Sequence, residues 1–355
     1  MIINGSHIRR LTNGFLFSFL TASSALLLSS CATQKSESLA LPQPVQMSNV
    51  SGGKKPIIVM VSVQDGEPVP FMVDSGTTET TIDISMESKL GKCLGRTKSN
   101  WAFYTNATVG VYAPPKLKLG NTTLAAGSRV KCEDLGKIFQ NHIPIKGVLG
   151  LDYLEHYCIQ LDFSARQLRF LDPEFPATNE LGKAYPLSIS WGGGAFVQSS
   201  LFCPGHLEFR ADTGLVGADF MLKPKVFERE LGSQKPIGGI TQGQRDFLAT
   251  FSFADEVVTN EVHLRTATMS NHIKHDAALF GKIIVGGERY SKISVVKGTQ
   301  QKWPAFNWMG LTFLSRHIVT MNFPKGVMYL KQFPDAPMKN FSEDAQFSTP
   351  SLLSN

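Results

Sequence analysis

Two stretches of sequence decide the fold: Val73-Asp74-Ser75-Gly76-Thr77 and Ala211-Asp212-Thr213-Gly214. Each comes at the end of a run in which apolar residues alternate with others, at 69–73 and at 207–211. Such alternation predicts a half-buried β-strand. An Asp-Ser/Thr-Gly triplet by itself is an ordinary turn sequence, so its meaning depends on what surrounds it.

The surroundings of the two triplets match, because the chain contains an internal repeat. When Asp74 is aligned with Asp212, the preceding apolar residues align too. When Gly150 is aligned with Gly310, the next 21 positions align without a gap. The matched pairs are Leu151 with Leu311, Tyr153 with Phe313, Leu154 with Leu314, Ile159 with Val319, and Phe163 with Phe323. The same order of strand, triplet, β region, apolar-apolar-Gly, short helix and closing hairpin therefore occurs twice.

The rest of the body is predicted to be mostly β. Strands are expected at 57–63, 69–73 and 117–119, and two more within 159–171 on either side of 164–166. Asp65-Gly66 is a hairpin-turn signal. Helical periodicity is brief and is confined to 85–90, 152–157 and 225–231. We therefore expect an all-β chain with a few short helices.

The two triplet loops resemble the active-site loops of aspartic proteases. Val148-Leu149-Gly150 and Trp308-Met309-Gly310 look like the motif that flanks each aspartate loop in that family, and the stretch 236–240 resembles a retroviral protease flap tip. The resemblance covers about residues 55–333 and is closer to retropepsins than to the larger pepsin lobes. It implies two similar retropepsin-like β-barrel lobes in one chain, 55–172 and 184–333. A linker at 173–183 would join them, with the active site at their interface.

The chemistry of this family explains the residue types. Two carboxylates about 3 Å apart cannot both ionise, so they share one proton, and one serves as base while the other serves as acid. We expect Asp74 and Asp212 to hold a water between them in this way, and Gly76 and Gly214 to allow close approach of the loops. By resemblance, the hydroxyls of Ser75 and Thr213 bond across to the opposite loop. The implied activity is aspartic-type endopeptidase hydrolysis of protein or peptide substrates, with no cofactor or metal.

Further site residues follow from the same resemblance. Trp101, Tyr104, Gly238, Gly239 and Ile240 are expected in flaps that cover the cleft and exclude water. Thr77 carries a hydroxyl that could bond the Asp74 carboxylate. Leu215 occupies the corresponding place in the second copy and cannot do this, which would leave Asp212 without that support and could raise its pKa.

Two alternatives stay open at this point. A catalytically silent protein could use the two-lobed cleft to bind peptides or a partner protein, because an extended peptide adds as a strand without needing the aspartates. Leu215 favours this alternative, whereas the presence of both aspartates and both glycines favours the protease. Alternatively, each lobe could pair with a copy from another chain, although a monomer is expected.

The N-terminal segment predicts export and a lipid anchor. Arg9-Arg10 precede an apolar run, Gly14 to Leu28, which is short for a membrane span and fits a secretory signal. Leu28-Ser29-Ser30-Cys31 resembles a bacterial lipobox, so 1–30 is predicted to be a lipoprotein signal peptide and Cys31 the lipidated residue. A flexible tether at 31–54 and a disordered tail at 334–355 would flank the body. Ala32 favours an outer-membrane anchor that faces the periplasm.

Composition excludes other classes. The 35 Lys and Arg exceed the 29 Asp and Glu only slightly, and no basic run exceeds two residues, so nucleic-acid binding is not expected. The chain has only one long apolar stretch, which rules out a polytopic membrane protein.

Four cysteines remain after Cys31 and permit three pairings. A disulfide between Cys93 and Cys132 is one hypothesis, and Cys158 is expected to be a buried apolar residue. His272 and His275 are expected at the surface, and Ser294 to Lys297 lies in a β stretch rather than on the helix that a Ser-x-x-Lys enzyme needs.

Overall fold

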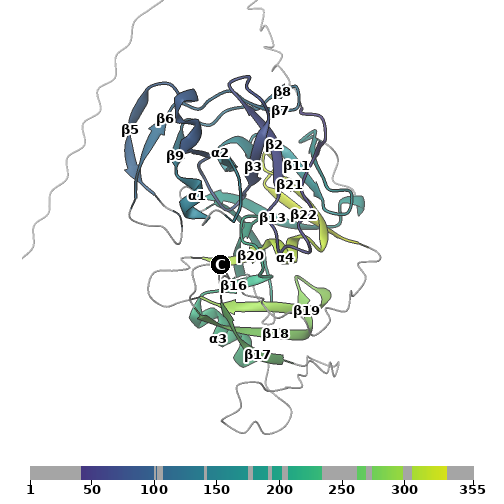
Figure 1. Cartoon of the computed structure of the whole chain (residues 1–355). Coiled ribbons are helices and arrows are strands. Elements are labelled where there is room, and N and C mark those ends of the chain that lie inside the picture. The colour runs from purple at the N-terminus through teal and green to yellow at the C-terminus, as the bar shows by residue number, and fades with distance from the viewer. Residues whose placement is uncertain are drawn as a thin grey trace, which may run out of the picture. The chain divides into compact units, whose positions relative to one another are not determined.

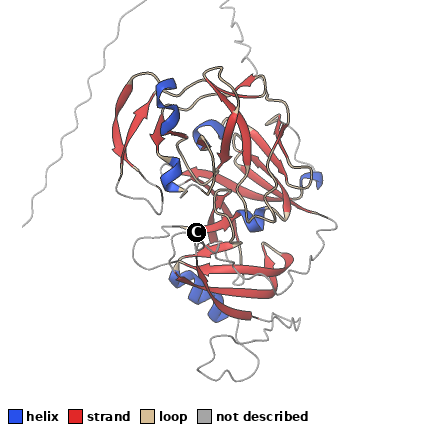
Figure 2. Ribbon diagram, viewed as in Figure 1, coloured by secondary structure: helices blue, strands red, loops and turns tan. Residues whose placement is uncertain are grey.

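The structure is a computed structural model that describes residues 41–99, 101, 107–139, 142–174, 179–190, 194–201, 207–233, 262–268, 274–298 and 306–333. These residues belong to one compact unit, Leu39–Asn355. Strands dominate them, and the helices are few and short (Figure 2). The prediction of a mostly β chain is confirmed.

The first half of the described chain contains twelve strands and three helices. The strands are β1 (Val45–Gln46), β2 (Ile58–Val63), β3 (Val69–Val73), β4 (Thr81–Asp83), β5 (Cys93–Lys98), β6 (Thr108–Tyr112), β7 (Leu117–Leu119), β8 (Thr122–Thr123), β9 (Val130–Glu133), β10 (Gly147–Leu149), β11 (Cys158–Asp162) and β12 (Gln167–Leu171). The helices are the 3₁₀-helix η1 (Ile84–Lys89), α1 (Leu135–Ile138) and α2 (Leu151–Leu154).

The second half of the described chain contains ten strands and three helices. The strands are β13 (Lys183–Ser190), β14 (Gly194–Ser199), β15 (Leu207–Asp212), β16 (Phe220–Leu222), β17 (Val262–Thr268), β18 (Lys274–Val285), β19 (Glu288–Lys297), β20 (Asn307–Gly310), β21 (His317–Asn322) and β22 (Val327–Gln332). The helices are the 3₁₀-helix η2 (Asn179–Leu181), α3 (Pro224–Ser233) and α4 (Leu311–Leu314).

Over the described residues these strands form two large sheets (Figure 1). The nine-stranded sheet has the order β5-β6-β9-β4-β10-β3-β2-β7-β8, and the thirteen-stranded sheet has the order β1-β12-β11-β21-β22-β13-β14-β15-β20-β16-β19-β18-β17. The run β5-β6-β9-β4-β10-β3-β2 has the same order as β17-β18-β19-β16-β20-β15-β14. In both runs the triplet strand pairs in parallel with the strand of the apolar-apolar-Gly motif, β3 with β10 and β15 with β20. The sequence repeat is therefore a repeat of sheet topology.

The closing hairpins of the two copies join in the larger sheet. β11 and β21 are antiparallel, and Gln160 lies opposite Thr320, its own counterpart in the repeat. Cys158 lies opposite Asn322, and Asp162 lies opposite Ile318. Since Asp162 aligns with Asn322 and Cys158 with Ile318, the register is self-complementary, as at a two-fold interface. The Gln160 amide donates to the Thr320 hydroxyl at 3.1 Å near this pseudo-two-fold axis.

A continuous hydrophobic core runs through both copies. Its large, fully buried side chains include Phe71 and Tyr153 in the first copy and Phe209, Phe220 and Phe313 in the second. Phe71 and Phe209 are two of the residues aligned by the repeat, and both point inward from the strand that leads to a triplet. The burial of these strands holds the triplet loops in place at their ends.

The disulfide guess is wrong, because Cys93 and Cys132 are free thiols. β6 lies between their strands, with Tyr112 opposite Cys93 and Gly110 opposite Cys132. The strands of the two cysteines are thus two strand spacings, about 9.6 Å, apart, and the offset between Tyr112 and Gly110 takes the cysteines farther apart still, which is too far for a disulfide. Cys158 is buried, as expected.

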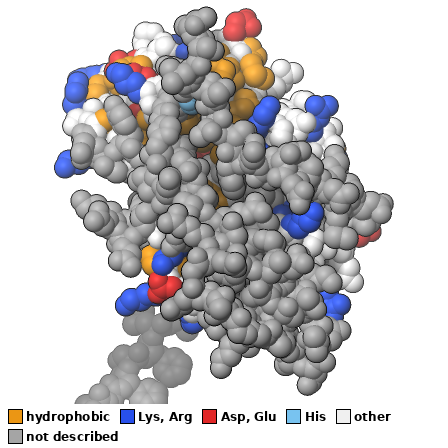
Figure 3. All heavy atoms as spheres, turned by 60° about the horizontal axis from the view of Figure 1, so that its bottom comes forward, with side chains coloured by type: hydrophobic (Ala, Val, Ile, Leu, Met, Phe, Trp, Pro, Cys, Tyr) orange, Lys and Arg blue, Asp and Glu red, His pale blue; other side chains and the backbone are white. Residues whose placement is uncertain are grey.

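Two further observations concern the residues that the structure describes. No helix within the described ranges is long and apolar enough to cross a membrane. On the face drawn in Figure 3, the visible Lys and Arg side chains lie at separate places around the described surface.

Candidate functional site

The two aspartates stand at the ends of matching strands. Asp74 follows β3, and its backbone N–H donates to the carbonyl oxygen of Leu149 at 3.0 Å. Asp212 is the last residue of β15 and lies opposite Gly310 on β20. Parallel pairing of this kind fixes the direction in which each chain leaves its strand, so both triplets begin from the same local geometry.

The two glycines show how closely the loops approach. A Cβ atom added to Gly76 would lie 2.3 Å from Cγ of Asp212, and one added to Gly214 would lie 2.5 Å from Cγ of Asp74. Each glycine therefore lies against the carboxyl of the opposite loop, where a side chain would not fit. Asp74 and Asp212 are 6% and 9% exposed. The structure thus brings together two buried carboxyls that are 138 residues apart in sequence.

Reciprocal hydrogen bonds join the loops. The Ser75 N–H donates to Oγ1 of Thr213 at 2.9 Å, and the Thr213 N–H donates to Oγ of Ser75 at 3.2 Å. The Ser75 hydroxyl donates to the carbonyl oxygen of Ala211 at 2.7 Å, and the Thr213 hydroxyl donates to that of Val73 at 3.0 Å. Because all four bonds are buried and cross between the copies, they fix the spacing of the aspartates.

Burial dominates the electrostatics of Asp74. Burial first and the charge of Asp212 second raise the pKa of Asp74, the Arg210 guanidinium and the Gly76 N–H lower it, and the net result is a pKa of about 7. The Gly76 N–H donates to Oδ1 of Asp74 at 2.7 Å. The pair therefore retains a proton into the range where an isolated aspartate is fully charged, and so it can offer an acid and a base together.

Leu215 offers Asp212 no side-chain hydroxyl, but the backbone supplies hydrogen bonds to the Asp212 carboxyl. Oδ1 of Asp212 accepts the N–H of Gly214 at 2.9 Å and the N–H of Leu215 itself at 2.8 Å. The backbone of residue 215 thus supplies a donor that its side chain lacks. The Thr77 hydroxyl lies 3.5 Å from the carbonyl oxygen of Glu79 instead of bonding the Asp74 carboxylate. Side-chain type alone does not reveal these backbone donors.

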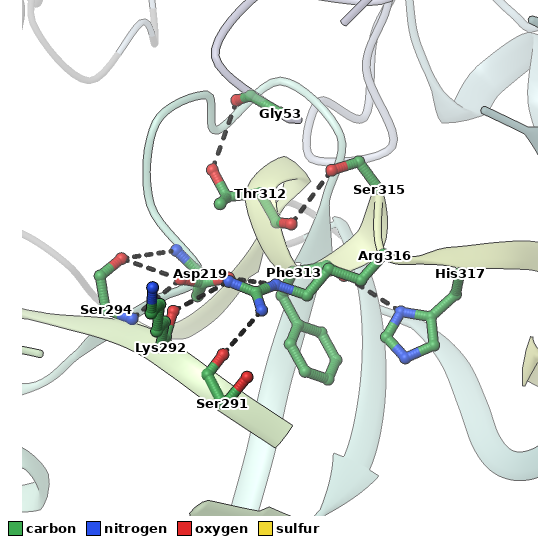
Figure 4. Close-up of polar contacts among 10 residues, drawn as sticks. All are labelled: Gly53, Asp219, Ser291, Lys292, Ser294, Thr312, Phe313, Ser315, Arg316 and His317. Carbon is green, nitrogen blue, oxygen red and sulfur yellow. Dashed lines mark hydrogen bonds and ion pairs between the residues drawn. The ribbon is translucent and has the colours of Figure 1, made fainter. Parts of the chain in front are cut away.

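A buried ion pair supports the second loop (Figure 4), and sequence reasoning missed it. Nε and Nη2 of Arg316 each lie 3.1 Å from Oδ1 of Asp219, and Oδ2 of Asp219 accepts the N–H and hydroxyl of Ser294 at 2.8 and 3.0 Å. The carbonyl oxygen of Asp219 accepts the N–H of Gly310 at 2.8 Å. The Asp-x-x-x-x-x-x-Asp spacing from Asp212 to Asp219 gives no signal for this, because Arg316 comes from beyond α4.

In the first copy a different set of hydrogen bonds holds the chain that follows the triplet. Oδ1 of Asp152, on α2, accepts the N–H and hydroxyl of Thr80 at 2.9 and 2.6 Å, and Oγ1 of Thr80 accepts the N–H of Gly150 at 2.9 Å. The glycine N–H of the apolar-apolar-Gly motif thus donates to a hydroxyl in the first copy and to a backbone carbonyl in the second, and in each copy a carboxylate holds the residue that accepts this bond or belongs to it.

Of the expected flap residues, Trp101 is described. It follows β5, in the β5–β6 hairpin, and its ring packs edge-on against Phe139 at 5.6 Å between centroids. The base of the hairpin is held by the Ser99 N–H, which donates to Ala107, and by the Ser99 hydroxyl, which donates to Oε2 of Glu133 at 2.8 Å. By strand order, the counterpart hairpin in the second copy is β17–β18. Tyr104, Gly238, Gly239, Ile240 and Cys31 lie outside the described residues.

Within the described ranges no group of three or more His, Cys, Asp and Glu side chains is arranged to hold a metal ion. No known protein-family model matches the chain, and no curated protein matches it either. A function must therefore be argued from the geometry of the two triplet loops.

Proposed function

We propose that this protein is an aspartic endopeptidase with two retropepsin-like lobes in one chain, which hydrolyses peptide bonds through a water held between Asp74 and Asp212. The observation that carries the proposal is the reciprocal approach of the loops, with Gly76 against Asp212 and Gly214 against Asp74. An ordinary turn gives no reason for two buried carboxyls to face each other, since their mutual repulsion and burial are costly.

The two-lobed arrangement is supported by the repeated strand order and by the self-complementary pairing of β11 with β21. We assign the lobes to 55–172 and 184–333. The four cross-loop hydrogen bonds of Ser75 and Thr213 would then keep the site in register between the lobes.

The mechanism needs one proton shared by the pair. The charged carboxylate takes a proton from the water, whose oxygen forms a bond with the carbonyl carbon of the peptide. The protonated carboxyl gives its proton to the carbonyl oxygen as the C=O π-bond breaks, which yields a gem-diol. As the gem-diol collapses, one of its hydroxyl protons passes to the charged carboxylate, and the carboxyl that took the proton of the water gives that proton to the leaving nitrogen as the C–N bond breaks. The products are an acid and an amine, and the pair again holds one proton.

We further propose that the enzyme is a lipoprotein of the bacterial cell envelope, anchored through Cys31 in the outer membrane and facing the periplasm. Support for this comes from the apolar run before Ser29-Ser30-Cys31 and from Ala32. Replacement of Cys31 by Ser should move the protein from the membrane fraction to the soluble periplasmic fraction. Retention in the membrane would contradict the anchor.

The activity is tested with an unbiased peptide mixture. Residues 32–355, Asp74→Asn and Asp212→Asn would each be incubated with the mixture from pH 3 to 7.5, and cleavages read by mass spectrometry. Cleavage by the parent that disappears in both variants is the expected result. Absence of cleavage at every pH, with all three proteins folded, would overturn the proposal and favour a silent peptide-binding protein.

A further inference from the structure

A row of three residues beside the aspartates differs between the copies. In the first copy Met72 lies opposite Ile58 on β2 and opposite Val148 on β10. In the second copy the corresponding row is Phe196, Arg210 and Trp308: Arg210 lies opposite Phe196 on β14 and opposite Trp308 on β20. The alignment that pairs Asp74 with Asp212 also pairs Met72 with Arg210. One flank of the site is thus apolar, and the other carries a cation between two aromatic residues.

Arg210 is held close to the aspartates. Its Nε lies 3.9 Å from Oδ2 of Asp212, and its side chain is only 19% exposed. Its Cζ lies 6.0 Å from the ring centroid of Trp308, within reach of a cation–π interaction. A Cβ atom at Gly194 would lie 2.7 Å from Nε, so the glycine makes room for the guanidinium. The Nε–H is buried and donates no hydrogen bond to the described residues.

This placement gives the carboxyl pair an electrical asymmetry. The two largest charged influences on Asp74 are Asp212, across the loops, and Arg210, on β15, which lowers the pKa of Asp74 as well; the ion-pair distance of 3.9 Å, however, joins Arg210 to Asp212. The side chains that flank Arg210 from β14 and β20 are Phe196 and Trp308, which do not titrate. At the aligned position of the first copy Met72 is neutral. A cation near Asp212 lowers the energy of the state in which Asp212 carries the negative charge.

We propose that Arg210 is a positioning residue that keeps the negative charge of the pair on Asp212 and the shared proton on Asp74. This proposal deepens the proposed function. If the protein is an aspartic endopeptidase, Asp212 is the base that takes the proton of the water, and Asp74 is the acid that protonates the carbonyl oxygen. Only this assignment of roles rests on the proposed function. The distribution of charge in the pair is a property of the folded protein and can be measured without a substrate.

The test is a ¹³C NMR titration of the aspartate side-chain carboxyls from pH 3 to 9, in the parent, Arg210→Met and Arg210→Lys. Met is chosen because it occupies the aligned position of the first copy, and Arg166→Met, on the exposed turn between β11 and β12, is the control with the same charge change. Asp74→Asn and Asp212→Asn assign the two signals. The parent should show Asp212 ionising at lower pH than Asp74. Arg210→Met should raise the first midpoint of the pair by about one pH unit, and Arg210→Lys should largely restore it.

Unchanged midpoints in folded Arg210→Met, or Asp74 ionising first in the parent, would overturn the inference. If Arg210→Met does not fold, Arg210→Lys and Arg210→Gln give the same comparison of a charged with a neutral side chain. A shift in the titration without cleavage of any peptide would leave the inference standing and remove the proposed function. If the parent cleaves peptides, but the acidic limb of its pH–rate profile stays at the same pH in Arg210→Met, the proposed function stands and the inference about Arg210 is removed.

Discussion

At the scale of single residues, the glycines of the triplets carry the sharpest steric prediction. Gly76→Ala and Gly214→Ala should each abolish cleavage, because the new Cβ would lie 2.3 to 2.5 Å from the opposite carboxyl group. The loops must separate to make room, at a cost of about 1–3 kcal/mol in the free energy of unfolding. Gly95→Ala on β5 is the matched control, since nothing lies within 4 Å of its Cβ position. Retained kcat/KM in either loop variant would contradict the close approach.

Asp74 predicts a pH-dependent stability. The pKa of Asp74 is about 7 in the folded protein and 3.8 for an isolated aspartate. Between pH 3.8 and pH 7 the folded state therefore keeps a proton on Asp74 that the unfolded state has released. Stability contributed by this group is therefore lost as pH rises from about 4 to about 7. Asp74→Asn should match the parent near pH 4 and exceed it at pH 8, by an amount on the order of 4 kcal/mol. Urea unfolding of both proteins across pH measures the difference; a gap that does not widen with pH would contradict it.

At the scale of elements, the Asp219–Arg316 pair anchors α4 to the second triplet loop. Arg316→Met would leave Asp219 buried without its cation and should cost about 3–5 kcal/mol of stability. The double variant Arg316→Met with Asp219→Asn should recover much of that loss, because no charge stays buried. Chemical unfolding of the two proteins measures this. If the double variant is as unstable as the single one, the pair is not the cause.

His317 at the start of β21 predicts the opposite pH dependence from Asp74. Burial lowers the pKa of His317 to about 4, and its ring lies between the Tyr290 hydroxyl at 2.9 Å and the Phe313 carbonyl oxygen at 3.0 Å. Between about pH 6.5 and pH 4 the imidazole of His317 is protonated in the unfolded state and neutral in the folded state. Stability therefore falls as pH drops from about 6.5 to 4. The loss is about 3 kcal/mol. His317→Gln should flatten this slope in thermal unfolding, and an unchanged slope would contradict the assignment.

The elements also show what sequence reasoning can and cannot reach. The strands at 69–73 and 117–119 were predictable from alternation, and the repeat predicted that α2 and α4 are counterparts. The predicted disulfide between Cys93 and Cys132 is wrong, because sequence spacing does not reveal that β6 lies between their strands. The support of Asp212 by the Leu215 N–H was missed because every residue type carries the same backbone donor. Asp219 and Arg316 were missed since their contact is made only in the folded chain.

At the scale of the whole molecule, the pairing of β11 with β21 joins the two copies within one chain. Because this pairing is intramolecular, the site needs no second chain, and specific activity should be independent of protein concentration. Sedimentation velocity should give a monomer over the range assayed. Specific activity that rises with concentration, together with a dimer, would indicate that copies pair between chains instead.

The pairing of Asp74 with Asp212 of the same chain is tested most directly by mixing the two singly inactivated proteins. Asp74→Asn, Asp212→Asn and an equimolar mixture of them would be assayed against a peptide that the parent cleaves. We predict that each variant is inactive and that the mixture stays inactive, because no molecule in it holds both carboxyls. Activity that survives either single substitution, or that returns on mixing, would contradict a single site built from the two copies of one chain.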